Sequence, residues 1–227
     1  MGRFRDFEPP AGADCNRSIA LRVTRRSFVR ATVVGLAGAA MRPVLAAPTA
    51  GPVPAGAKAL SPTLLHRALD ALDRHRSRID QRDTIGIADF SLHSRAPRFH
   101  LLNLLDGTAI SHLVAHGRGS DPTHTGWLER FSNEPRSQAT SAGAYRTDAL
   151  YIGEHGRSMR LEGLDRTNDN AAARAIVVHG AWYVSEEIVT HFGMLGRSEG
   201  CLAVPSSSLD EVLAKLGPGR MIYADKA

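Results

Sequence analysis

Short apolar segments with the two-residue period of β-strands follow one another from residue 84 to the C-terminus. Turn-forming pairs such as Asp106-Gly107 separate neighbouring segments, as in antiparallel hairpins. Many short strands must bury their apolar faces against each other. We therefore expect a mostly β fold with a few short helices, arranged as a sandwich or a barrel. The expected strands cover residues 84–90, 99–105, 108–116, 144–153, 158–164, 175–180 and 220–224.

Other segments carry the boundary signals of helices. Residues 61–80 begin with Ser61 as an N-cap and Pro62 in the first turn, followed by leucines on one face. Two shorter apolar-periodic segments each follow a serine, Ser185 or Ser208, and each precedes a glycine. The two shorter helices are predicted over residues 186–192 and 209–216.

The N-terminal residues have the pattern of an export signal. Arg25 and Arg26 precede Phe28, an apolar run follows, and small residues permit cleavage after Ala46. Paired arginines at this position are typical of a twin-arginine signal. The apolar run is about half the roughly 20 residues that span a bilayer, so we expect no stable membrane span after cleavage. We predict a signal peptide over 1–46, a Pro/Gly/Ala-rich linker over 47–59 and a folded domain over 60–227.

Removal of the leader changes the charge of the chain. The full sequence has a net charge of +5, with 28 basic and 23 acidic residues. Residues 1–46 contain eight arginines and three acidic residues, which leaves 20 of each sign in the mature chain. A neutral domain lacks the basic surface that nucleic acid requires, so we expect no nucleic-acid binding. An exported chain is expected in the periplasm or cell envelope.

Cys201 is the one cysteine that remains after the predicted cleavage, because Cys15 lies in the leader. An unpaired cysteine in an oxidising compartment is either buried and inert or reactive. The surrounding residues 195–200 are polar and glycine-rich, which argues against a core segment. A reactive thiol needs a base and donors for an oxyanion. Gly200 leaves room for a carbonyl beside the sulfur, and Ser198 can donate a hydrogen bond.

Three histidines precede a glycine and are candidate bases: His116, His155 and His179. His179 ends the most apolar strand, where a side chain is held rigidly, whereas the other two lie in polar, glycine-rich stretches. His112 and His116 are four residues apart, but no zinc-binding motif occurs. We therefore predict no metal site and no organic cofactor.

The pair His179-Gly180 followed by residues 198–201, "SEGC", resembles the His-Gly and Ser-x-Gly-Cys signature of the L,D-transpeptidase (YkuD-type) catalytic domain. The resemblance is to the branch of murein L,D-transpeptidase catalytic-domain-like proteins, and it covers roughly residues 85–224. Four further stretches support it: "LVAHGRGSD", "RFSNEPRSQATSAGAYRT", "YIGEHGRSMRLEGLD" and "NDNAAARAIVVHGAWYVSEE". It implies a β-rich catalytic domain over residues 60–227.

The resemblance also implies a role for each site residue. Cys201 matches the nucleophile, His179 the general base, Gly180 the carbonyl that orients the imidazole, and Ser198 the motif serine. Gly200 and Cys201 would supply oxyanion N–H groups. Gly143, Tyr145 and Arg197 are the predicted substrate-binding residues.

The first two of these substrate-binding residues lie in a segment that resembles the family's cleft-lining Thr-x-x-Gly-aromatic stretch. The family commonly has an arginine where this chain has Ala203, and Arg197 is the candidate to replace its charge. The departure bears on substrate choice more than on the chemistry.

The implied activity is that of an exported cysteine acyltransferase, an L,D-transpeptidase that joins donor and acceptor stem peptides of peptidoglycan through a thioester. An L,D-carboxypeptidase would use the same Cys201 and His179. A non-catalytic cell-wall-binding protein is the alternative from another class, and the absence of the family arginine is its only support. The sequence indicates no oligomeric state.

Overall fold

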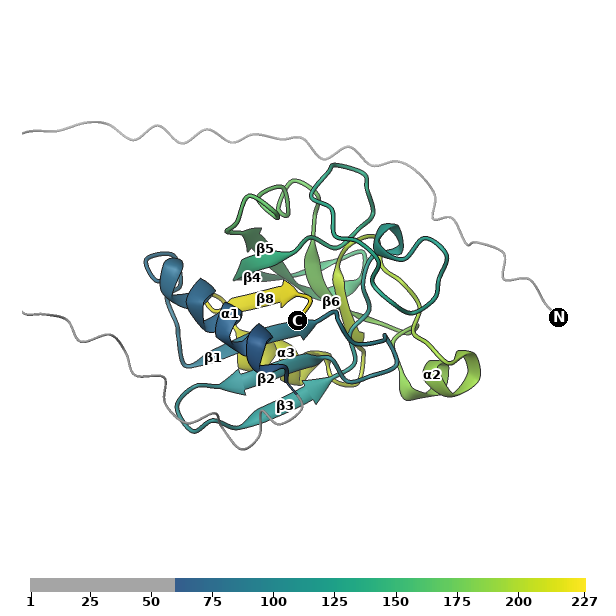
Figure 1. Ribbon diagram of the computed structural model, residues 1–227, viewed down its shortest axis with the longest axis horizontal. Coiled ribbons are helices and arrows are strands. Elements are labelled where there is room, and N and C mark those ends of the chain that lie inside the picture. Colours follow the sequence, from purple (N-terminus) through teal and green to yellow (C-terminus); the bar gives the residue numbers. More distant parts are fainter. Residues whose placement is uncertain (1–59) are drawn as a thin grey trace, which may run out of the picture. The chain divides into compact units, whose positions relative to one another are not determined.

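Eight strands form one mixed sheet in the computed structural model, which describes residues 60–227 (Figure 1). The strand order is β3-β2-β1-β8-β4-β5-β6-β7, with β1–β8 and β6–β7 parallel and the other pairs antiparallel. The predicted signal peptide and linker lie outside the described residues. The strands are β1 (Thr84–Asp89), β2 (Phe99–Asn103), β3 (Ala109–His112), β4 (Gly143–Gly153), β5 (Gly156–Gly163), β6 (Val177–Ala181), β7 (Leu202–Pro205) and β8 (Met221–Asp225).

The two edges of this sheet meet. The chain that continues from the edge strand β3 forms a bridge to the other edge strand, with the Ala115 N–H donating to the Ala203 carbonyl at 2.8 Å. The sheet therefore curls round as in a barrel, which leaves little strand edge exposed for unwanted pairing. The predicted mostly β fold with a few short helices is confirmed.

The helices are α1 (Pro62–Arg74), α2 (Glu186–Phe192) and α3 (Leu209–Leu216). The prediction for 61–80 was too long: α1 ends at Arg74 with His75 as its C-cap, and residues 75–78 form a turn. Ser185 caps α2 as predicted, accepting a hydrogen bond from the Ile188 N–H. Ser208 stands before α3, but its side chain makes no capping hydrogen bond.

The apolar side chains form separate clusters on the two faces of the curled sheet. The inner cluster includes Phe99, Tyr145, Met159 and Leu202, and α3 packs against it. Helix α1 covers the outer face of β1 and β8, as Figure 1 shows. No helix among residues 60–227 is long and apolar enough to cross a membrane.

A third, smaller apolar cluster lies at the end of the sheet formed by β6 and β7. It consists of Leu113, Ala115, Ala181, Val184, Leu195 and Ala203. Its partly buried neighbours are Tyr183 and Val189, the second of which belongs to α2. This cluster supports the segments that carry the predicted histidine and cysteine.

Candidate active site

Cys201 and His179 lie on neighbouring strands. Cys201 immediately precedes β7, which runs parallel to β6 with His179 paired to Ala203. The two residues are therefore two positions apart along adjacent strands, a separation of about 8 Å between Cα atoms in a regular sheet. The strand predicted over residues 175–180 runs from Val177 to Ala181, so His179 lies within it and is held from both sides by strand pairing.

The Cys201 thiol is buried, with 9% of the residue exposed. Its Sγ–H donates to the Ala175 carbonyl at 3.6 Å. Burial raises the pKa of Cys201, while a backbone hydrogen bond from Val177 and the charge of Arg174 oppose this rise. The resting group at neutral pH is therefore a thiol rather than a thiolate.

His179 is 3% exposed, and its Nδ1–H donates to the Gly180 carbonyl at 3.0 Å. This is the orienting hydrogen bond that the resemblance implied. It leaves the lone pair of the ring on Nε2. Burial lowers the pKa of His179 to about 4, so the imidazole is neutral at neutral pH and can accept a proton. The ring stacks on His155, which lies in the β4–β5 turn, with a centroid separation of 4.2 Å.

Ser198 braces the loop that carries the cysteine. Its Oγ–H donates to the Cys201 carbonyl at 2.7 Å and its Oγ accepts from the Gly200 N–H at 3.1 Å. The Gly200 N–H was expected to point at an oxyanion. In this conformation it is engaged by Ser198, so that role requires the hydrogen bond to break first.

Gly200 is needed for a different reason from the one inferred from the sequence. Its φ is +120°, a region that residues with side chains rarely adopt. A Cβ at this position would lie 2.9 Å from the Ala139 carbonyl oxygen and 2.7 Å from Ile176 Cδ1. The backbone passes too close to its neighbours for any side chain.

Thr140 links the cysteine loop to the preceding loop. Its hydroxyl accepts from the Gly117 N–H at 2.9 Å and donates to the Gly200 carbonyl at 3.2 Å. Thr140 is fully buried, so both backbone groups depend on it rather than on water. Thr140 belongs to the segment predicted to line a cleft, and its hydrogen bonds hold the backbone next to Cys201 in place.

Gly143 and Tyr145 are both buried in this structure, and their substrate-binding role stays a prediction. Tyr145 is fully buried in the inner cluster, and its hydroxyl donates to the Ser141 carbonyl at 2.7 Å. Gly143 has a φ of +121°, and a Cβ there would lie 2.7 Å from Asp165 Oδ2. Both residues lie at the start of β4.

Arg197 binds backbone carbonyls of a neighbouring loop. Its Nη1 donates to the backbone carbonyls of Asp121 and Pro122, the latter at 3.3 Å. Among the described residues, Arg174, which precedes β6, is the cation whose charge acts to lower the pKa of Cys201. The sequence interpretation missed Arg174, whose only signal was a single charge in an alanine-rich stretch just before the His179 strand.

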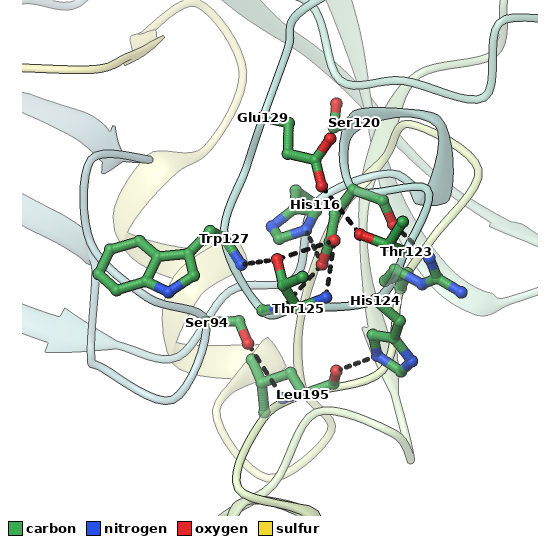
Figure 2. Close-up of polar contacts among 12 residues, drawn as sticks. Ser94, His116, Ser120, Thr123, His124, Thr125, Trp127, Glu129 and Leu195 are labelled. Atoms are coloured by element: carbon green, nitrogen blue, oxygen red, sulfur yellow. Dashed lines mark hydrogen bonds and ion pairs between the residues drawn. The ribbon is translucent and has the colours of Figure 1, made fainter.

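His116 was expected to be loosely held, but it is 1% exposed and is one of the most constrained side chains of the site. Arg98 Nη2 donates to its Nδ1 at 2.7 Å, so Nε2 carries the proton and faces Asp121 Oδ2 at 3.4 Å. Burial lowers the pKa of His116 to about 3. Figure 2 shows His116 and Thr125 in one polar network, and Asp121 hydrogen-bonds with both residues. The His116 carbonyl accepts from the Ser198 N–H at 3.0 Å, so it supports the cysteine loop.

His112 and His116 belong to different groups of contacts. His112 Nε2 lies 3.7 Å from Oε2 of Glu211, a residue of helix α3. Within residues 60–227, no group of three or more His, Cys, Asp and Glu side chains is arranged to hold a metal ion.

Comparisons with known proteins agree with the resemblance. The L,D-transpeptidase catalytic domain family matches residues 56–224. No curated protein sequence matches the chain. Among solved structures, an L,D-transpeptidase from Mycobacterium smegmatis is 14% identical with a TM-score of 0.38, over 63% of this chain and 58% of that one. One from Xylanimonas cellulosilytica is 15% identical with a TM-score of 0.37, over 69% and 68%.

The helical cell shape determining protein Pgp2 from Campylobacter jejuni is 13% identical with a TM-score of 0.40, over 65% of this chain and 48% of that one. The match to this chain covers less than two thirds of the length of the Mycobacterium smegmatis structure. These similarities are low, whereas the family match covers most of the sequence. The chain therefore belongs to the L,D-transpeptidase catalytic domain family.

Proposed function

We propose that this chain is an exported cysteine acyltransferase acting on peptidoglycan stem peptides, an L,D-transpeptidase that works through a Cys201 thioester. The observation that carries the proposal is that a buried thiol and a neutral imidazole lie two register positions apart on neighbouring segments of chain, with the imidazole oriented by the Gly180 carbonyl. Family membership supplies the substrate class. The predicted signal in residues 1–46 fits a substrate that lies outside the cytoplasm.

In the first half-reaction, Cys201 Sγ attacks the carbonyl carbon between the L-centre of a diamino acid and a terminal D-residue. The thiol proton passes to His179 Nε2. The C–N bond then breaks, and the departing D-amino acid takes this proton on its nitrogen. The product is a thioester on Cys201.

In the second half-reaction, an amine of a neighbouring stem attacks the thioester carbon and gives its proton to His179. The C–S bond breaks, and the sulfur recovers the proton as a thiol. Water in place of the amine would give a shortened stem, which is the carboxypeptidase reaction. The same two side chains serve both outcomes.

The electrostatics of the site favour proton transfer during the attack rather than before it. Burial raises the pKa of Cys201 and lowers the pKa of His179 to about 4. Both shifts disfavour a resting thiolate–imidazolium pair, because neither charge is well solvated. The imidazole therefore acts as a general base at the moment when the carbonyl receives the sulfur electrons.

The experiment is mass spectrometry of the products formed when the purified chain is mixed with tetrapeptide muropeptides. Cys201→Ala is the inactive variant, and Cys15→Ala is the matched control that should leave the products unchanged. Cross-linked dimers that depend on Cys201 would support transpeptidation. Tripeptide monomers alone would reassign the chain as an L,D-carboxypeptidase. Unchanged substrate with every variant would refute the catalytic proposal and favour a cell-wall-binding protein.

A further inference from the structure

A tight turn just before β6 presents two groups to the Cys201 loop. The Arg174 N–H donates to the Asn170 carbonyl and the Ile176 N–H to the Ala171 carbonyl, each at 2.9 Å. Ala175, between them, has a φ of +53°, which is unusual for a residue with a side chain. Its carbonyl is the acceptor of the Cys201 thiol. The turn is therefore held in an uncommon conformation at the point where it touches the sulfur.

The Arg174 side chain, which leaves the same turn, is fixed at both ends of its guanidinium. Nη1 donates to the Ser132 carbonyl at 2.8 Å and to Ser141 Oγ at 2.7 Å. Nη2 donates to Ser137 Oγ at 3.1 Å and to the Ala139 carbonyl. All four acceptors are uncharged. Hydrogen bonds to carbonyls and hydroxyls orient a guanidinium but leave its charge unneutralised.

Within residues 60–227, the charges that act on Arg174 come from two acidic groups, Cys201 and the buried Tyr145 phenol, and neither is ionised in the resting protein. The guanidinium lies against the residue that precedes Cys201, since a Cβ built on Gly200 would be 3.3 Å from Arg174 Nη2. An uncompensated cation in a partly buried position attracts any negative charge that develops nearby.

The other charged or titratable groups that face Cys201 do not supply a cation. Glu199 acts against a negative sulfur, and the Tyr183 phenol is neutral because burial raises its pKa. His179, on β6, is neutral in the resting site. Arg197 is directed to the carbonyls of residues 121 and 122. Arg174 is thus the cation in place when the sulfur loses its proton.

Position 203, where the resemblance leads one to expect an arginine, cannot accommodate one in this fold. Ala203 is fully buried in the small apolar cluster beside Leu195 and Ala115. An arginine there would place a charge among aliphatic side chains, which is strongly unfavourable. A cation near the sulfur has to come from another element.

We propose that Arg174 is a positioning residue that stabilises negative charge on the Cys201 sulfur from the turn before β6, in place of an arginine at position 203. This inference rests on the proposed function only in taking Cys201 to be the nucleophile. The charge acts in both half-reactions, because the sulfur carries electron density whenever its proton is on His179.

The test measures the ionisation of Cys201 directly. In a Cys15→Ala background, iodoacetamide alkylates the Cys201 thiolate with release of iodide, and the rate is followed by intact mass from neutral to alkaline pH. Arg174→Gln should raise the midpoint of this profile by about one pH unit and slow alkylation at neutral pH about tenfold. Arg174→Lys should restore most of the rate, and Arg197→Gln, the matched control, should leave the midpoint unchanged.

A purely structural role gives different results. Loss of the four hydrogen bonds would loosen the loop, expose the sulfur and speed alkylation, and it would do so in the Lys and Gln variants alike. An unchanged midpoint in Arg174→Gln, or an equal shift in Arg197→Gln, would overturn the proposal. If Arg174→Gln does not fold, Arg174→Lys provides the test. An alkylation midpoint in Arg174→Lys that lies one pH unit above that of the unsubstituted chain would overturn the proposal.

Alkylation needs no peptidoglycan, so the two proposals fail separately. A midpoint shift in a chain that leaves muropeptides unchanged would refute the proposed function and retain the effect of Arg174 on the sulfur. If the chain cross-links muropeptides but its alkylation midpoint is the same in Arg174→Gln, the proposed function would stand and the proposed effect of Arg174 would be refuted.

Discussion

Thr140→Val should separate the support of the cysteine loop from the general stability of the fold. Valine keeps the shape of threonine but removes its hydroxyl. The Gly117 N–H and the Gly200 carbonyl would then be buried without their partner, which bonds them at 2.9 and 3.2 Å. Each unsatisfied buried group costs roughly 1–3 kcal/mol, so loss of the partner of both groups should lower the free energy of unfolding by about 2–6 kcal/mol.

A loss of this size should lower the Tm of a chain of this length by about 4–24 °C. Because the Gly200 carbonyl is adjacent to Cys201, the loop should also lose its fixed geometry. Turnover of muropeptides should fall about tenfold or more, since small displacements of a reacting atom weaken catalysis strongly. The assays are urea denaturation followed by circular dichroism and product formation followed by mass spectrometry.

The matched control is Thr147→Val. Thr147 is also fully buried, accepts from the Arg220 N–H at 2.8 Å and donates to the Gly217 carbonyl at 2.6 Å. Its partners belong to the connection between α3 and β8, so this variant should lose similar stability and keep its turnover. Equal losses of turnover in both variants would refute the view that Thr140 acts on the cysteine loop.

Three further results are expected. The free energy of unfolding should fall as pH decreases from about 6.5. The reason is that burial lowers the pKa of His116 to about 3 and that of His179 to about 4, so the unfolded chain binds more protons than the folded one. Urea midpoints that stay constant between neutral pH and about pH 4 would contradict this. Gly200→Ala should abolish turnover, because the new Cβ would meet the Ala139 carbonyl at 2.9 Å; normal product yields would show that the loop can shift. Tyr145→Phe should lower the free energy of unfolding by about 1–3 kcal/mol and leave turnover unchanged, since its hydroxyl bonds a buried carbonyl. A raised KM with an unchanged free energy of unfolding would instead support the predicted substrate-binding role.

The strands and short helices could be predicted because their signals are local. A period of two residues, a serine before a helix and a glycine after it act within a few residues of chain, and the structure follows them in β1, β2, β4, α2 and α3. Strand β7 has no such signal. Its four residues form a strand because β6 lies parallel to them, a partner that precedes it by more than twenty residues.

The pair Cys201 and His179 was also accessible from the sequence, because the resemblance fixes their motifs at set positions. The roles of their neighbours were not. Tyr145 belongs to a recognisable motif, yet its side chain faces the core. His116 lies in a polar, glycine-rich stretch, yet its side chain is buried against Arg98. Motif letters do not reveal which side of a curled sheet a side chain faces.

The sequence by itself determined the mostly β class, the nucleophile and base candidates and the family. Only the tertiary structure decided which arginine side chain lies against the Cys201 loop. Arg197 is four residues from Cys201 in the chain but is directed to the loop of residues 121 and 122, whereas Arg174, twenty-seven residues away, is brought to it by the parallel pairing of β6 and β7. Electrostatic attraction depends on distance through space, and strand pairing sets that distance independently of separation along the chain.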